Sequence, residues 1–310
     1  MNFQPGVYCL SGIRNKPFWA KLGLLFITVI WGSAFVVVKD VSSSMPPSYI
    51  VVIRFGITAV CLSLIFWKRL ARIGRTELIG GLVIGIFNVL GFELQTYGLQ
   101  KTTAGNSAFL TAIYCVIVPF LSWAVKKKRP GASNIVSAFL CIAGVGLLSL
   151  KNGFAIMPGD VLSLLCGVSF AAQIVAIDIF TAKVDPILLT VTQSVATAVL
   201  ALPIALRFET FPASAGTGTV LSLLYIALFS TMLAFLMQMV CQKYVPPSQA
   251  SLIMSLESVF GALCGIIFLH ETMTIRMFFG CVLIFAAIYL SERQPGRLAL
   301  KINDGKNTFL

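Results

Sequence analysis

Ten long apolar runs constrain the fold of this chain more than any other feature of its sequence. Each run has about 17 to 23 residues, enough for a helix with a rise of about 1.5 Å per residue to cross a hydrocarbon core about 30 Å thick. The composition agrees, because 58% hydrophobic and 11% charged residues lie far outside the soluble range. The sequence predicts an all-α polytopic membrane protein with ten transmembrane helices at about 21–38, 48–67, 77–99, 104–125, 133–150, 160–181, 186–206, 219–240, 248–269 and 274–291.

The basic residues of the chain predict its orientation in the membrane. With a cytoplasmic N-terminus, seventeen of the 23 Lys and Arg fall in cytoplasmic segments, five fall on the opposite side and one, Arg54, lies within a span. This asymmetry satisfies the positive-inside rule and places both termini in the cytoplasm. The net charge of +12 is thereby explained by topology, so no nucleic-acid partner is expected.

Three short similarities, in the same order along the chain, indicate an internal repeat. An offset of 135 residues aligns 32–35 with 167–170, and an offset of 139 aligns Pro47 and Arg54 with Pro186 and Gln193. An offset of 142 aligns 99–110 with 241–252. Five spans per half is an odd number, so the halves must insert in opposite orientations, an arrangement that favours a carrier. We expect an N-terminal tail (1–20), a first repeat (21–150), a linker (151–158), a second repeat (159–291) and a C-terminal tail (292–310).

Several motifs resemble the EamA-type transporters of the drug/metabolite transporter superfamily. They are Trp31-Gly32-Ser33-Ala34-Phe35, the spacing from Pro47 to Arg54-Phe55, Tyr97-Gly98-Leu99-Gln100, and the spacing from Leu256-Glu257-Ser258-Val259-Phe260 to Leu269-His270-Glu271. The resemblance covers about residues 20 to 291. It implies ten helices in two EamA repeats and secondary transport, often export, of amino acids, other small metabolites or drugs.

Arg54 and Glu93 lie at matching depths, each about 10 Å below the outer surface at about 1.5 Å per residue. A charge inside a bilayer is costly, so each should face a cavity or a partner. Two interpretations stay open: a structural ion pair between neighbouring helices, or a gate or substrate-carboxylate site at Arg54.

Glu257 lies about 13 Å deep, near the midplane. Ala250, Met254, Gly261 and Cys264 share its helical stripe and are small or pliant, which leaves room for a ligand or a close helix. A glutamate in a low dielectric favours its protonated form, as a proton-coupling group requires, and it could also receive a cationic amine. The alternative is a protonated glutamate hydrogen-bonded to a neighbouring helix.

A second set of polar or aromatic residues lies at mid-depth, where each either joins helices or contacts a ligand. These candidates are Trp31, Asn88, Gln95, Tyr97, Tyr114, Gln173 and Gln238. Three further polar residues are expected at the membrane interface, namely Asp178, His270 and Glu271.

No nucleotide-binding loop, catalytic triad or metal-ligand spacing occurs in the sequence, and the cysteines are interpreted as small hydrophobic residues. We therefore expect no enzyme, no cofactor and no metal. The sequence predicts a gradient-driven exporter of small metabolites in the plasma or inner membrane, working by alternating access in the lipid bilayer. Coupling to a proton or another ion, and a homodimer, remain open. The alternative is a non-transporting membrane subunit or receptor.

Overall fold

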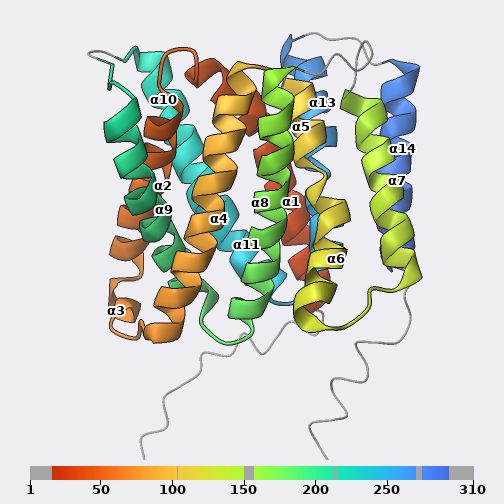
Figure 1. The fold of residues 1–310 in the computed structure, drawn as a ribbon, viewed down its shortest axis with the longest axis horizontal. Helices are drawn as coiled ribbons and strands as arrows, with labels where there is room; N and C mark the ends of the chain where they lie inside the picture. The colour runs from red at the N-terminus through yellow and green to blue at the C-terminus, as the bar shows by residue number, and fades with distance from the viewer. Residues whose placement is uncertain (1–15, 103, 150–156, 213–214, 270–273, 293–310) are drawn as a thin grey trace, which may run out of the picture.

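The computed structural model describes residues 16–102, 104–149, 157–212, 215–269 and 274–292, and every regular element in this part of the chain is helical (Figure 1). Most of the predicted tails (1–15 and 293–310), most of the predicted linker, His270 and Glu271 lie outside the described residues, whereas 16–20 of the predicted N-terminal tail belong to the first helix. The elements are α1 (Lys16–Val41), α2 (Pro47–Ile65), α3 (Trp67–Leu70), α4 (Arg75–Gln100), α5 (Ala104–Thr111), α6 (Tyr114–Lys126), α7 (Ala132–Ser149), α8 (Pro158–Thr181), α9 (Pro186–Phe208), α10 (Thr217–Tyr225), the π-helix η1 (Ile226–Leu233), α11 (Ala234–Gln242), α12 (Pro247–Met254), α13 (Glu257–Leu269) and α14 (Ile275–Glu292).

Eight helical stretches are long and apolar enough to cross a membrane: Lys16–Val41, Pro47–Ile65, Arg75–Gln100, Asn106–Lys126, Pro158–Thr181, Pro186–Phe208, Thr217–Gln242 and Ile275–Glu292. The other two predicted spans correspond to the shorter apolar helix Ala132–Leu147, within α7, and to the pair α12 and α13. Proline begins α2, α8, α9 and α12, where the first N–H of a helix has no partner within the helix and its absence costs no hydrogen bond. The polytopic all-α fold predicted from the sequence is confirmed.

The fourth and ninth predicted spans differ from the prediction, because each is broken near its middle. α5 gives way to α6 at Ala112 and Ile113, and α12 gives way to α13 at Ser255 and Leu256. Tighter turns of the i to i+3 type replace the helical pattern there, for example Cys115 N to Ala112 O at 3.0 Å. Neither break contains Gly or Pro, so the apolar pattern gave no sign of them.

Three ion pairs mark one end of the bundle, which we call the terminal end. Lys21 near the start of α1 pairs with Glu292 at the end of α14, and Lys126 at the end of α6 pairs with Asp178 near the end of α8. The third pair, between Arg69 and Asp185, is 3.4 Å long. The first and last described helices therefore meet at the same end, where the loops after α2, α6 and α8 also lie (Figure 1). The opposite end is called the distal end.

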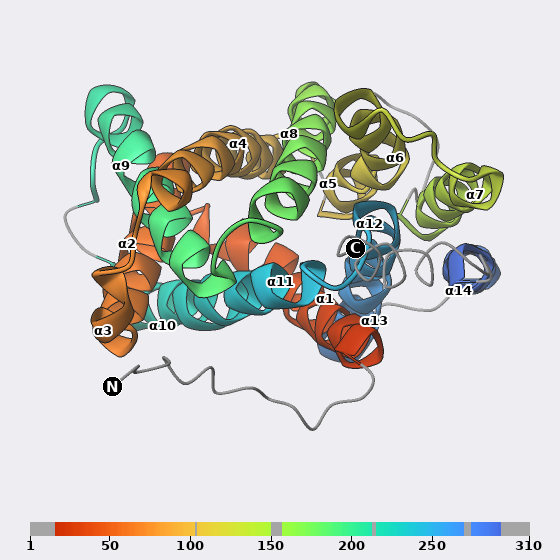
Figure 2. The ribbon, with the colours of Figure 1, turned by 90° about the horizontal axis from the view of Figure 1, so that it is seen from below.

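The two halves of the chain run in opposite senses. α1 begins at the terminal end, whereas α8, the first helix of the second half, finishes there through Asp178. The halves interlock: α1 packs on α11, α12 and α13, and α4 packs on α8 and α9 (Figure 2). The pair α7 and α14, one helix from each half, lies at the edge of the bundle.

Two glycines from the repeated motif lie where a helix of one half crosses the broken helix of the other. A Cβ atom on Gly32 of α1 would lie 2.7 Å from the Glu257 carbonyl oxygen and 2.7 Å from the Gly261 nitrogen. A Cβ atom on Gly167 of α8 would lie 2.8 Å from the Thr111 carbonyl oxygen. Real Cβ contacts do not come this close, so both crossings require glycine. The repeat detected in the sequence is thus a repeat of packing.

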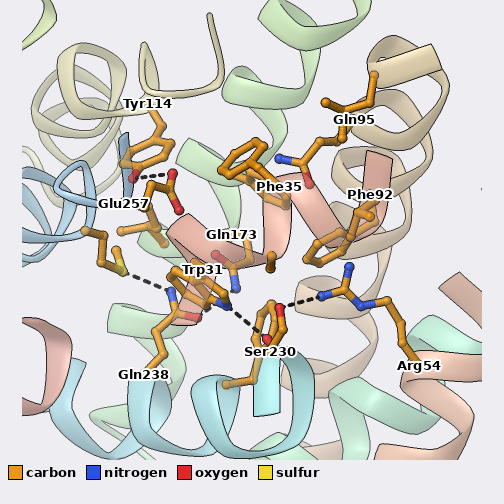
Figure 3. A pocket seen from close by; sticks show the side chains of 17 residues that line it. Trp31, Phe35, Arg54, Phe92, Gln95, Tyr114, Gln173, Ser230, Gln238 and Glu257 are labelled. Atoms are coloured by element: carbon orange, nitrogen blue, oxygen red, sulfur yellow. Dashed lines mark hydrogen bonds between the residues drawn. The ribbon is translucent and has the colours of Figure 1, made fainter. Parts of the chain in front are cut away.

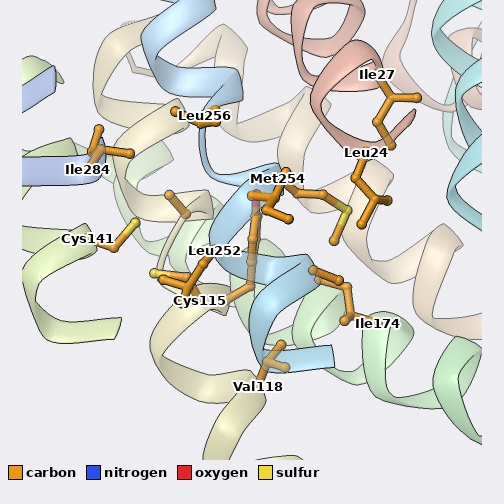
Figure 4. Packing of buried hydrophobic residues seen from close by; sticks show 14 of the residues in the cluster. Leu24, Ile27, Cys115, Val118, Cys141, Ile174, Leu252, Met254, Leu256 and Ile284 are labelled. Carbon is orange, nitrogen blue, oxygen red and sulfur yellow. The ribbon is translucent and has the colours of Figure 1, made fainter. Parts of the chain in front are cut away.

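An apolar cluster surrounds α12 and extends to α1 and α14, and its α1 members lie toward the terminal end of the bundle (Figure 4). Leu24 and Ile27 of α1 and Leu252 of α12 are fully or almost fully buried in it. A second cluster, which includes Val38, Val41 and Leu99, occupies the distal side. The polar side chains described next lie between these two apolar layers.

Candidate functional site

A cavity between the two apolar layers is lined by both halves of the chain (Figure 3). The empty space between its lining atoms is about 610 Å³, which includes the part that opens out of the protein. The lining side chains are Trp31, Ala34, Phe35, Val38, Arg54, Phe92, Gln95, Leu99, Tyr114, Phe170, Gln173, Ile174, Ser230, Phe235, Gln238, Met254 and Glu257. The structure therefore brings together Trp31, Arg54, Gln95, Tyr114, Gln173, Gln238 and Glu257 from the sequence-based candidates.

Tyr114 and Glu257 meet where the two broken helices begin again. Each is the first residue of its second half-helix, α6 and α13, and an offset of 143 residues along the chain relates the two positions. The Tyr114 hydroxyl donates a hydrogen bond of 3.1 Å to Glu257 Oε1, and the two residues are 4% and 6% exposed. The free N–H groups at a helix start carry partial positive charge. The carboxyl of Glu257 thus lies beside a half-helix start at the centre of the bundle.

Arg54 lines the opposite part of the cavity and is 3% exposed. Its Nε donates to Thr231 Oγ1 at 2.7 Å and its Nη2 donates to Ser230 Oγ at 3.3 Å. The guanidinium carbon lies 4.3 Å from the centre of the Phe92 ring, a cation–π distance. Within the described part of the chain no carboxylate lies within 4.0 Å of this guanidinium. This positive charge is therefore buried without a counter-charge from any residue that the structure describes.

The ion pair considered between Arg54 and Glu93 does not form, so that interpretation was wrong. The guanidinium turns toward η1 instead, because the hydroxyls of Ser230 and Thr231 satisfy its donors. The Ser48 hydroxyl lies 2.8 Å from Glu93 Oε2, within hydrogen-bond distance, and Glu93 does not line the cavity. Equal depth on two helices did not reveal which faces the helices turn toward each other.

Tyr97 and Asn88 also lie outside the cavity lining. The Tyr97 hydroxyl donates to Glu209 at 2.5 Å near the distal end of α4. Asn88 Nδ2 donates to Gln193 Oε1 at 2.9 Å in the interface between α4 and α9. Asn88 therefore joins two helices, which is one of the two roles considered for it from the sequence.

The Asn88–Gln193 contact has a counterpart in the Ser230–Arg54 contact. The offset of 139 residues lays Arg54 on Gln193, and the offset of 142 residues lays Asn88 on Ser230. Each half thus sends a polar side chain from its second helix to the third helix of the other half. Only the Arg54–Ser230 contact carries a charge and borders the cavity. The two halves therefore have the same helix arrangement but different side-chain chemistry at these positions.

Amide and indole groups complete the polar wall. Trp31 Nε1 donates to the Ser230 carbonyl oxygen at 2.9 Å. Gln173 Nε2 lies 3.5 Å from Gln238 Oε1, and Gln238 Nε2 in turn lies 3.6 Å from Met254 Sδ. Gln238 Nε2 is also 3.4 Å from Gln242 Oε1, so both of its N–H groups have partners and the two cavity amides belong to one hydrogen-bonded chain.

Four aromatic side chains of the cavity were not singled out as candidates from the sequence: Phe35, Phe92, Phe170 and Phe235. Phe35 and Phe170 did carry a signal, because they occupy the same position of the repeated motif. Phe92 and Phe235 carried none, since the chain has 24 phenylalanines and most apolar positions of a span are equivalent in sequence. Asp178 pairs with Lys126 at the terminal end, in agreement with its predicted interfacial place.

The family model described as EamA-like transporter family matches residues 18–150 and 157–293. An uncharacterized transporter of Archaeoglobus fulgidus is 36% identical over 275 residues, which are 89% of this chain and 86% of that protein. The uncharacterized transporter YoaV of Bacillus subtilis is 25% identical over 87% of this chain and 95% of its own length, and the protein PecM of Dickeya dadantii is 25% identical over 85% and 89%.

A solved crystal structure superposes with a TM-score of 0.75 at 16% identity, covering 89% of this chain and 98% of that chain, and shows the same fold. Two copies of the family model span nearly all of the described chain, and the transporters named above match it over most of their lengths. The chain belongs to the EamA-like transporter family and is a multi-pass membrane transporter.

Proposed function

We propose that the protein is a gradient-driven carrier that exports a small metabolite by alternating access through the central cavity. The single observation that carries this proposal is the cavity itself: it lies between the two inverted halves and is bordered by both broken helices. Discontinuous helices that meet at the interface of inverted repeats are typical of carrier binding sites.

The charges of the cavity favour a substrate with both charged and apolar parts. Arg54 lies on one side and Glu257 on the other, with aromatic rings between and around them (Figure 3). A buried guanidinium without a counter-charge favours an anionic group such as a carboxylate, and Glu257 with its Tyr114 partner favours an amine or a proton. Amino acids or related compounds fit this pattern, and drugs of similar chemistry would also fit.

The apolar layers on the two sides of the cavity support alternating access. Leu24 and Leu252 lie between the cavity and the terminal end, and Val41 and Leu99 lie toward the distal end. We expect access from each side to depend on how closely the layer on that side is packed. The two halves have the same helix arrangement in opposite orientations, so we expect the states open to each side of the membrane to be similar in free energy.

The proposed orientation in the membrane is supported by the charge asymmetry of the sequence. The basic loops gather at the terminal end, which we assign to the cytoplasm of a cell bounded by a plasma or inner membrane. Export then moves the substrate from the terminal end to the distal end, and Glu257 is the first candidate for coupling that movement to a proton.

Counterflow in proteoliposomes tests the function. Vesicles containing the purified protein are loaded in turn with single amino acids and related metabolites, and uptake of the labelled compound is measured. A carrier gives saturable exchange for at least one compound, and Arg54→Ala and Glu257→Gln abolish it while the protein stays folded. Arg69→Ala and Glu292→Gln are matched controls outside the cavity and retain exchange. Absence of exchange with every compound contradicts the proposal and favours a non-transporting subunit or receptor.

A further inference from the structure

A second buried polar site lies at the distal end, apart from the cavity. Ser48 Oγ, in the first turn of α2, is 2.8 Å from Glu93 Oε2 on α4 and 3.1 Å from Glu209 Oε1 at the end of α9. Glu209 also accepts the backbone N–H groups of Ser48 at 3.1 Å and Tyr49 at 3.3 Å, and the Tyr97 hydroxyl at 2.5 Å. Two carboxyl groups from different halves thus converge on one serine.

If both carboxyls are ionised, the site has too few protons for the two hydrogen bonds around Ser48 Oγ. A serine hydroxyl has one proton, so it donates to one acceptor at a time. Here it lies within hydrogen-bond distance of two carboxyl oxygens. One of the two contacts therefore needs a proton that a carboxyl carries.

The surroundings assign that proton to Glu93. Glu209 receives the N–H groups at the start of α2 and the Tyr97 hydroxyl, which all stabilise a negative charge. Glu93 is 9% exposed, and its Oε1 is buried without a hydrogen-bond partner among the described residues. When Ser48 donates to Glu209, an ionised Glu93 in this buried place has no donor among the described residues.

The two carboxyls also lack a basic partner in the part of the chain that the structure describes. Within the described residues, no basic nitrogen lies within 4.0 Å of Glu93 or Glu209. Charged or titratable groups on the elements packed around this part of α4 have other partners. Arg54 donates to Ser230 and Thr231, Lys39 donates to the Thr102 carbonyl oxygen, and Asp160 accepts from the Thr102 hydroxyl. The Tyr49 ring packs on Phe211, and Arg207 is exposed at the surface.

We propose that Glu93 binds an exchangeable proton and that Ser48 links it to ionised Glu209, forming a proton site separate from the substrate cavity. Release is a relay: the Glu93 proton passes to Ser48 Oγ while the Ser48 proton passes to Glu209, which gives it to water. Glu209 is the partly exposed member and provides the exit. The site goes beyond the proposed carrier function, because proton binding here requires no particular substrate.

Infrared spectroscopy of the full-length protein in lipid vesicles tests the proposal, since protonated and ionised carboxyls absorb in separate bands. At neutral pH, Glu93→Gln removes one protonated-carboxyl band, and this band shifts in D₂O because the proton exchanges. Ser48→Ala shifts the band to higher wavenumber, because the carboxyl loses its hydrogen-bond acceptor. Glu209→Gln removes the neighbouring negative charge, so the band disappears at a lower pH than in the unsubstituted protein.

Glu77→Gln is the matched control, because this carboxylate caps the start of α4 at the terminal end. It leaves the protonated-carboxyl bands unchanged. A Glu93→Gln spectrum that keeps every protonated-carboxyl band, or loses a carboxylate band instead, overturns the proposal. If Glu93→Gln does not fold, an unshifted spectrum of Ser48→Ala overturns it equally. The measurement needs no transported substrate, so a failed counterflow experiment and a failed proton site are distinguishable.

Discussion

Tyr114 and Glu257 are joined by a 3.1 Å hydrogen bond across the centre of the molecule, and each begins the second half of a broken helix. They occupy equivalent positions of the two halves, so this contact lies where the inverted repeats face each other. Repacking of either half against the other must move this pair, which makes it sensitive to the conformational state.

Tyr114→Phe removes the hydroxyl that contacts Glu257 and leaves the ring in place. Hydrogen bonds between membrane helices contribute about 0.6 kcal/mol on average, so we expect a small loss of thermal stability in detergent. Counterflow should fall more strongly, because the carboxyl loses its oriented partner. Tyr244→Phe, at an exposed tyrosine outside the cavity, should change neither quantity. Equal effects of the two substitutions would contradict a role of Tyr114 in the site.

Thr231 should set the orientation of Arg54 through the π-helix η1. Its hydroxyl donates to the Ile226 carbonyl oxygen at 2.8 Å and accepts from Arg54 Nε at 2.7 Å, so its polarity is fixed. A hydrogen bond to a charged group contributes about 1.5 to 3 kcal/mol, so Thr231→Val should weaken apparent affinity by about 10- to 100-fold.

Thr231→Ser, which keeps the hydroxyl, should restore most of the affinity in the same counterflow titration. Arg54→Lys keeps the charge but loses the planar fork, and it should behave like Thr231→Val. Unchanged affinity in both Thr231→Val and Arg54→Lys would exclude this orientation as a determinant of binding.

Gly32→Ala should destabilise the protein, whereas Gly56→Ala should not. A Cβ on Gly32 meets backbone atoms at 2.7 Å, which cannot be relieved by side-chain movement, and overpacking costs about 1 to 3 kcal/mol. Gly56 has nothing within 4 Å, so alanine there should gain up to about 1 kcal/mol of helix propensity. Melting temperatures in detergent give the comparison, and Gly167→Ala should follow Gly32→Ala. A milder effect at Gly32 than at Gly56 would refute the packing argument.

Asn88 and Gln193 should be energetically coupled. Their amides share a 2.9 Å bond, and the remaining atoms, Asn88 Oδ1 and Gln193 Nε2, are buried without partners among the described residues. A double-mutant cycle with Asn88→Ala and Gln193→Ala, read by chemical unfolding, should give a coupling of about 0.6 kcal/mol and at most about 1.7. Strictly additive losses would show that the amides contribute only separately.

The loops after α2 and α6 should be labelled from the same side of the membrane. In a background without native cysteines, cysteine at Arg72 or Lys128 should react with an impermeant maleimide only when the cytoplasmic face is open. Cysteine at Lys101, in the connection after α4, should react from the outside. Labelling of positions 72 and 128 from opposite sides would overturn the inverted arrangement.

The apolar helices and the repeat could be predicted from the sequence, because apolar length and internal similarity are properties of single segments. The orientation drawn from loop charge stays a prediction. Glu257, Arg54, Tyr114 and Trp31 were also found from the sequence, since a polar or large aromatic group at mid-depth is rarely placed there without a cavity or a partner.

The tertiary structure alone decided which groups meet. The helix breaks at 112–113 and 255–256 lack Gly and Pro, so only packing between the halves reveals them. Arg54 and Glu93 have matching depths, yet Arg54 bonds to η1 and Glu93 to Ser48, because rotation of each helix about its axis is set by its neighbours. Depth can be read from the sequence, whereas facing direction depends on residues that are distant along the chain, 45 positions away for Glu93 and 177 for Arg54.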